Sequence, residues 1–199
     1  KNLIVKNKGL KKLISNSLKK KITYQDIGFN IGPLINSSGR IAKANDVVEL
    51  FLTQNEDKID KILNKMNTHN VTRKKIEQEN LDLIDFKKYY SKNVIFIYNK
   101  KFHEGVIGIL AAKLSKIFNK PCFIMTESHD LLKCSIRSAN NVKINKTINK
   151  LIANKLIISG GGHDEAGGFS AKKKCLYDIE EFLNNEYRNL KSRGYSYFD

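Results

Sequence analysis

Residues 94–125, VIFIYNKKFHEGVIGILAAKLSKIFNKPCFIM, determine how this chain is expected to fold. The runs at 94–98 and 121–125 are short and apolar, as buried β-strands are, and residues 105–118 between them form an apolar segment of helical length. A strand, a helix and a second strand in this order predict an α/β fold, in which helices cover a sheet.

The same alternation continues toward the C-terminus. We expect a strand at 131–137, a helix at 143–155, a strand at 156–159 and a closing helix at 171–190. These elements predict one α/β domain over residues 91–190, followed by a short polar tail at 191–199.

The N-terminal half has a different pattern. Short helices are expected within residues 1–21 and at 44–51, whereas residues 26–40, DIGFNIGPLINSSGR, are rich in Gly, Asn, Ser and Pro and predict a structured loop. Residues 56–90 have the apolar stripe of a long connector helix, with a candidate bend around a solvated His69.

The chain of 199 residues carries a formal net charge of +16, large enough to attract polyanions such as nucleic acids. Two basic regions, 1–45 and 91–199, flank a nearly neutral connector. Heavy use of Lys, Asn and Ile, as in proteins from AT-rich genes, is an alternative source of part of this charge. Only five of the 36 basic residues are arginine, so Arg40 and Arg137, which lie inside motifs, are candidates for guanidinium-specific binding.

Four segments have residues suited to phosphate binding, and each also has a purely structural interpretation. The first is NSSGR, in which Asn36, Gly39 and Arg40 predict a glycine turn. From such a turn a guanidinium can bind two phosphate oxygens, although it can equally pair with a carboxylate. The second is FHEGVIGI, where His103 precedes a helix whose free N–H groups favour an anion, or else only caps that helix.

The third segment is KCSIRS. On a strand, Lys133, Ser135 and Arg137 share one face, while the residues between them point into the core. One hydroxyl and two cations on one face, followed by Ser138, predict a phosphate clamp. A solvated edge strand is the alternative.

The fourth segment is SGGGHDEAGGF. Successive glycines can turn several N–H groups toward one point, so Gly161 and Gly162 predict an anion nest beside His163, with a flexible linker as the alternative. A metal site that includes Asp164 and Glu165 is disfavoured, because adjacent carboxylates point in different directions.

The three cysteines, Cys122, Cys134 and Cys175, show no CxxC spacing and are odd in number, which favours buried thiols in a reducing cytoplasm. No apolar run approaches the roughly 20 residues that cross a membrane. Residues 1–20 lack the unbroken apolar stretch of a signal peptide.

Taken together and in this order, four segments resemble the RecJ-type single-strand-specific exonucleases of the DHH phosphoesterase superfamily. They are DIGFNIGPLINSSGR, FHEGVIGILAAKLSKIFNKPCFIM, CSIRS and GGGHDEAGG. The first is similar to the end of the family's catalytic DHH domain and the others to its DHHA1 domain. The resemblance, from about Lys8 to about Tyr187, implies a DHH remnant at 1–55, a connector helix at 56–90 and a DHHA1-type mixed sheet covered by helices at 91–190.

The resemblance also implies residue roles. It predicts phosphate contacts for Arg40, Ser135, Arg137, Gly161, Gly162 and His163, with supporting roles for Asn36, Gly39, His103 and Ser138. Three positions depart from the family pattern: Leu34, where arginine is frequent, Cys134, where glycine is, and Gly167, where alanine is. The cation missing at Leu34 is expected to weaken the grip on DNA.

Members of this family hydrolyse phosphodiesters with two divalent metal ions, Mg²⁺ or Mn²⁺, held by DxD-like and DHH motifs. No DHH, DxD or HxD motif occurs in this sequence, which therefore offers no catalytic or metal-binding residues. The implied protein is the C-terminal part of a 5′-to-3′ single-stranded-DNA exonuclease, inactive without a DHH domain upstream or on another chain. The alternatives are a nano-RNase or cyclic-dinucleotide phosphodiesterase fragment, and a stand-alone nucleic-acid-binding DHHA1 module.

Overall fold

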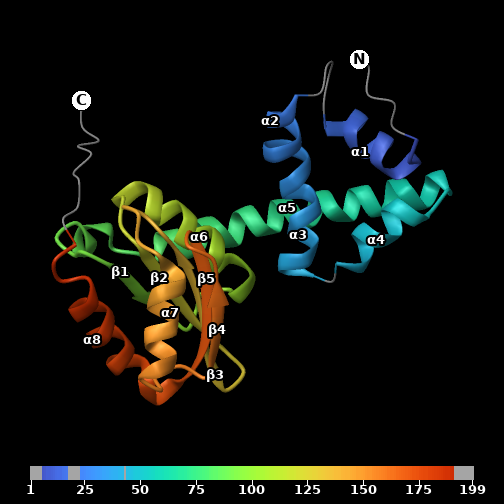
Figure 1. Cartoon of the computed structure of the whole chain (residues 1–199). Helices are drawn as coiled ribbons and strands as arrows, with labels where there is room; N and C mark the ends of the chain where they lie inside the picture. The colour runs from blue at the N-terminus through green and yellow to red at the C-terminus, as the bar shows by residue number, and fades with distance from the viewer. Residues whose placement is uncertain (1–5, 18–22, 43, 191–199) are drawn as a thin grey trace, which may run out of the picture. The chain divides into compact units, whose positions relative to one another are not determined.

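The structure is a computed structural model that describes residues 6–17, 23–42 and 44–190 (Figure 1). The chain divides into two compact units, Lys1–Ile76 and Glu77–Asp199, each with its own hydrophobic core. The helix predicted within 1–21 is only partly covered by the described residues, and the tail predicted at 191–199 lies outside them.

The first unit is helical. The helices are α1 (Lys8–Ser17), α2 (Tyr24–Asp26), the π-helix η1 (Ile27–Ile31), α3 (Gly32–Ile41), α4 (Asn45–Leu52) and α5 (Glu56–Asp82), which continues into the second unit. Of these, α1, η1, α3, α4 and α5 contribute apolar side chains to a common core. Leu34, the position where the resemblance leads us to expect an arginine, packs against this core.

The prediction of a loop at residues 26–40 is wrong, because this segment is helical from α2 through α3. Thr23 and Asp26 form a capping box that starts the helix, and Pro33 lies in the first turn of α3, directly after the π-helix η1. Ser37 is buried, and its hydroxyl donates to a carbonyl of the preceding turn at 2.7 Å. Capping and burial thus outweigh the low helix propensity of the glycines, about 1 kcal/mol each.

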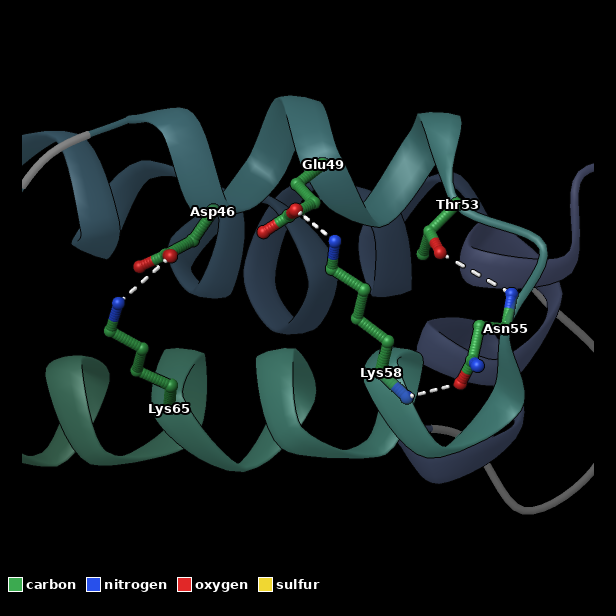
Figure 2. A network of polar contacts seen from close by, with 6 residues as sticks. All are labelled: Asp46, Glu49, Thr53, Asn55, Lys58 and Lys65. Atoms are coloured by element: carbon green, nitrogen blue, oxygen red, sulfur yellow. Dashed lines mark hydrogen bonds and ion pairs between the residues drawn. The ribbon is translucent and has the colours of Figure 1, made fainter.

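Polar contacts join α4 to the start of α5, as Figure 2 shows. Lys65 Nζ lies 2.9 Å from an Asp46 carboxylate oxygen, and Lys58 pairs with Glu49. The side-chain oxygen of Asn55 accepts from the Lys58 backbone N–H at 2.9 Å and so caps α5. Exposed ion pairs contribute at most about 1 kcal/mol each, so the buried apolar side chains account for most of the stability of this helix pair.

The helix predicted at 56–90 is shorter than expected. α5 runs unbroken past the candidate bend at His69 and ends at Asp82, and a 3-10 helix, η2 (Phe86–Tyr89), follows it. The Asp85 carboxylate accepts from the Lys87 backbone N–H at 3.2 Å, which starts η2 as a separate helix.

The second unit contains a five-stranded mixed sheet in the order β1-β2-β3-β5-β4. β1 and β2 are parallel, and the other neighbours are antiparallel. This architecture confirms the predicted α/β class and the mixed sheet. The strands are β1 (Ile95–Tyr98), β2 (Cys122–Ser128), β3 (Leu131–Arg137), β4 (Ser159–Gly162) and β5 (Ala166–Lys172).

The C-terminal elements differ from those predicted. The strand expected at 156–159 begins only at Ser159, and β5 occupies residues assigned to the glycine loop and to the start of the closing helix. That helix, α8 (Leu176–Glu186), is therefore shorter and follows a 3-10 turn, η3 (Lys173–Cys175). Pairing with β3 stabilises β5 despite its two glycines, because tertiary context outweighs strand propensity.

Helices cover both faces of the sheet (Figure 1). α6 (Glu104–Phe118) packs against β2 and β3 on one face. α7 (Ile144–Ala153) and α8 share a large core with the other face, to which Phe123, Ile136 and Phe169 contribute. Helices α6 and α7 and strand β3 confirm the pattern expected from the sequence.

Candidate nucleic-acid interface

Strand β3 presents polar side chains to the α6 side of the sheet. Alternate residues of this strand are buried in the α7 and α8 core, whereas Lys133, Ser135 and Arg137 are half-buried on the opposite face. Gly108 of α6 lies against them, since a Cβ there would be 3.1 Å from Ser135 Oγ and 3.8 Å from an Arg137 guanidinium nitrogen. The predicted shared face of these three side chains is confirmed.

The β-sheet register extends this face across β5 and β4. Residues directly opposite one another on antiparallel strands project to the same side of a sheet. Ser135 is opposite Gly168, which is opposite Gly161, so the middle row carries only one side chain. The surface called the polar face below consists of Lys133, Ser135, Arg137, Ala166, Gly168, Ser170, Ser159 and Gly161. Beyond Lys133, Leu131 and its partner Lys172 continue the same side of the sheet.

The glycine run forms an edge strand, so the prediction of an anion nest in a loop is wrong. A Cβ on Gly160 would lie 2.9 Å from Phe169 Cβ, and one on Gly162 would lie 2.3 Å from the Ala166 carbonyl oxygen. A Cβ on Gly161 would meet nothing within 4 Å. Packing therefore requires the outer two glycines, while Gly161 keeps the polar face flat.

His163, Asp164 and Glu165 form the turn between β4 and β5. The Ser138 N–H donates to the Glu165 carbonyl at 2.8 Å, which ties this turn to the end of β3, and Asp164 pairs with Lys143 at 3.3 Å. The His163 side chain is exposed, two residues beyond Gly161. Over the described residues, no group of three or more His, Cys, Asp or Glu side chains could hold a metal ion.

His103 caps α6, which is the structural role considered for it. Its Nδ1 accepts from the Gly105 backbone N–H at 3.1 Å. With Nδ1 as the acceptor, the neutral ring carries its proton on Nε2. Because the side chain is exposed, this Nε2–H is available to donate to a ligand at the start of α6.

A groove of about 840 Å³ begins where β3 ends, lined by Arg137, Ser138, Lys116 and Lys143 among others. The Ser138 hydroxyl donates to the Val142 carbonyl at 2.5 Å, so this residue shapes the loop at the groove's wall. The groove gives a ligand held near Arg137 room to continue past the sheet.

The remaining predicted residues lie in the first unit. Asn36, Gly39 and Arg40 lie on α3 and not in a glycine turn. His69, expected to be solvated, is half-buried, and its Nδ1 lies 3.3 Å from the hydroxyl of the buried Ser38. Sequence reasoning missed this contact because nothing in the pattern links residues 31 positions apart. The structure thus gathers Ser135, Arg137, Gly161, Gly162 and His163 in one unit, whereas Arg40 belongs to the other.

Residues 91–189 match the family model of the DHHA1 domain. This segment is a DHHA1 domain. Over 87% of its length the chain is 30% identical to the single-stranded-DNA-specific exonuclease RecJ of Salmonella typhimurium, and over 86% it is 26% identical to that of Haemophilus influenzae. A crystal structure of RecJ from Thermus thermophilus in complex with Mn²⁺ matches 90% of the chain with a TM-score of 0.81 at 22% sequence identity.

The chain is similar to only part of these proteins. It spans 32% of the length of both RecJ sequences and 27% of the Thermus chain. All residues of the polar face lie within the DHHA1 match. The assignment of residues 1–55 to a DHH remnant stays a prediction. Within the part of the chain that the structure describes, no helix is long and apolar enough to cross a membrane.

Proposed function

We propose that this chain is the substrate-binding C-terminal part of a RecJ-like 5′-to-3′ exonuclease and binds phosphates of single-stranded DNA on the polar face of its DHHA1 domain. One observation carries the proposal. The polar face combines cations and hydroxyls with a row of glycines, whereas the opposite face of the same strands is packed with large apolar side chains. A net charge of +16 adds attraction for a polyanion.

Each part of the polar face suits a phosphodiester backbone. The planar guanidinium of Arg137 can donate two parallel hydrogen bonds to one phosphate, and Ser135 adds a hydroxyl beside it. Gly168 and Gly161 lack side chains, so the DNA backbone can approach the β-sheet closely there. His163 and the Nε2–H of His103 are directional donors at the margins.

Cleavage requires groups that these residues do not supply. Two-metal hydrolysis needs carboxylate and histidine ligands that generate the nucleophile and stabilise the leaving oxygen. The described residues contain no such cluster, so they do not fit Mg²⁺ or Mn²⁺, and we expect a catalytic DHH domain, as partner of this chain in the cytoplasm, to hold these ions. This chain therefore positions a DNA strand without cutting it. Arg40, with Asn36 and Gly39, is a further proposed phosphate ligand on the resemblance alone.

Fluorescence anisotropy with labelled oligothymidylate tests the binding site. Arg137→Gln should weaken binding about tenfold or more, because a hydrogen bond to a charged group contributes about 1.5–3 kcal/mol. Arg188→Gln removes the same charge after α8, on the other side of the sheet, and should change affinity little. If both variants lose the same affinity for oligothymidylate, binding depends only on the net charge of the protein, which would contradict a phosphate site on the polar face.

A nuclease assay tests whether this chain binds single-stranded DNA without cleaving it. The purified chain should bind single strands more tightly as salt is lowered and should leave them intact in Mn²⁺. Cleavage that survives repurification and is lost in Arg137→Gln would show that this chain contains its own catalytic centre.

A further inference from the structure

Lys133 lies on the polar face, two residues before Ser135 along β3. Its Nζ donates to Ser170 Oγ at 2.9 Å, across the β3–β5 pair. On its other side, Lys133 is opposite Thr126 of β2, whose hydroxyl donates to the Phe102 carbonyl at 2.7 Å. The lysine therefore lies between Ser170 of β5 and Thr126 of β2, and its ammonium group is bonded to the serine.

The charge of Lys133 is not neutralised by the protein. Some lysines of this unit pair with carboxylates, as Lys113 does with Glu77 and Lys150 with Glu186. Among the described residues, no carboxylate lies within the 4.0 Å of an ion pair from Lys133. A hydroxyl partner orients the ammonium without cancelling it, and both groups keep further donors for a ligand.

The spacing of the face matches a chain of phosphates. Residues two apart on a strand are separated by about 6.6 Å and point to the same side. Lys133, Ser135 and Arg137 therefore place their polar groups at regular steps along a line. A nucleic-acid backbone places successive phosphates at a comparable separation, so a DNA strand parallel to β3 would present successive phosphates at successive steps of this line.

We propose that Lys133 and Ser170 form a second phosphate subsite, next along the strand from the phosphate held by Ser135 and Arg137. This inference rests on the proposed function and specifies its substrate class. The domain engages at least two neighbouring phosphates, so it recognises a strand several nucleotides long in preference to a mononucleotide.

The test compares 5′-phosphorylated hexathymidylate with thymidine 5′-monophosphate, which has one phosphate. Lys133→Met keeps the apolar stem of the side chain and removes the charge. It should weaken hexamer binding and lower the slope of log affinity against log salt by about 0.7, the value for one phosphate of a single strand. Binding of the monophosphate, followed by NMR titration, should not change.

Two controls make the result specific. Lys146→Met removes an exposed lysine of α7, on the opposite face, and should leave the slope unchanged. Ser170→Ala removes only a hydroxyl, so it should weaken hexamer binding without changing the slope. Thermal melts establish that each variant is folded, and Ser170→Ala carries the test if Lys133→Met does not fold.

The outcomes separate this inference from the proposed function. If Arg137→Gln weakens both ligands while Lys133→Met and Ser170→Ala affect neither, the second subsite is wrong and the first stands. If Arg137→Gln affects neither ligand, the phosphate site itself is wrong. If Lys133→Met weakens the monophosphate as much as the hexamer, Lys133 serves the first subsite and the proposal of a second one is overturned.

Discussion

Separate alanine substitutions at Gly160 and Gly161 test the register on which the polar face depends. A Cβ at Gly160 would lie 2.9 Å from Phe169 Cβ and 3.0 Å from Ile148 Cγ2, closer than the optimal carbon contact of about 3.5–4.0 Å. Ile148 is buried in the α7 core, so it has little space to yield. Overpacking of this kind costs about 1–3 kcal/mol, and Gly160→Ala should lower the free energy of unfolding by that amount.

Gly161→Ala should impair DNA binding and not stability. Its Cβ would meet nothing within 4 Å, so alanine should leave stability unchanged or raise it by about 0.4–1 kcal/mol through the lower entropy of the unfolded chain. The added methyl group stands on the polar face, where we propose that the DNA backbone approaches. Gly161→Ala should therefore weaken binding of oligothymidylate while the protein remains fully folded.

Urea unfolding followed by circular dichroism measures the first effect, and anisotropy with labelled oligothymidylate measures the second. If Gly161→Ala lowers the free energy of unfolding and Gly160→Ala does not, the register of β4 against β5 is wrong. A shift of one residue exchanges the two faces of a strand. Unchanged DNA binding by Gly161→Ala would refute the close approach of a strand to this row.

Two further predictions concern groups away from the polar face. Burial raises the pKa of the Cys122 and Cys134 thiols, so a thiol reagent at mildly alkaline pH should label Cys175 first and the others only on unfolding; rapid labelling of all three would contradict the core. A hydrogen bond from Lys173, with one from a tyrosine, holds the pKa of Glu127 below its usual range. This contribution is present above the unfolded pKa of about 4.3 and is lost as pH falls through the folded value, so Glu127→Gln should be less stable than wild type at neutral pH and converge with it in acid. Melting temperatures that differ equally at every pH would contradict this linkage.

The first three strands and α6 are predictable because local pattern decides them. β1 and β2 are apolar runs buried on both faces, and the alternation along β3 matches one covered and one polar face. Ser135 and Arg137 could be placed on one face for the same reason, since the period of two is a property of any strand.

Strands β4 and β5 could not be predicted in this way. Glycine has low strand propensity, and nothing local distinguishes the run at Gly160 from a loop. Its conformation follows from pairing with β5 and from the fit against Ile148 and Phe169, which are close only after folding. Helix α3 is similar, because burial of Ser37 and Ser38 overrides a composition typical of loops.

The Lys133–Ser170 contact lies beyond sequence reasoning for a related reason. It joins residues 37 positions apart, and it depends on the register of β3 against β5. The pattern shows which side of a strand a residue faces but not which residue of the next strand lies opposite.

Strand β4 also bears on how the protein avoids self-association. It forms one edge of the sheet, and an uncovered edge is a template on which another chain can add a strand. Here the edge is only four residues long and it ends at a charged turn, and both features disfavour the addition of a foreign strand. The chain can therefore display bare backbone to a ligand with little risk of growing into larger sheets.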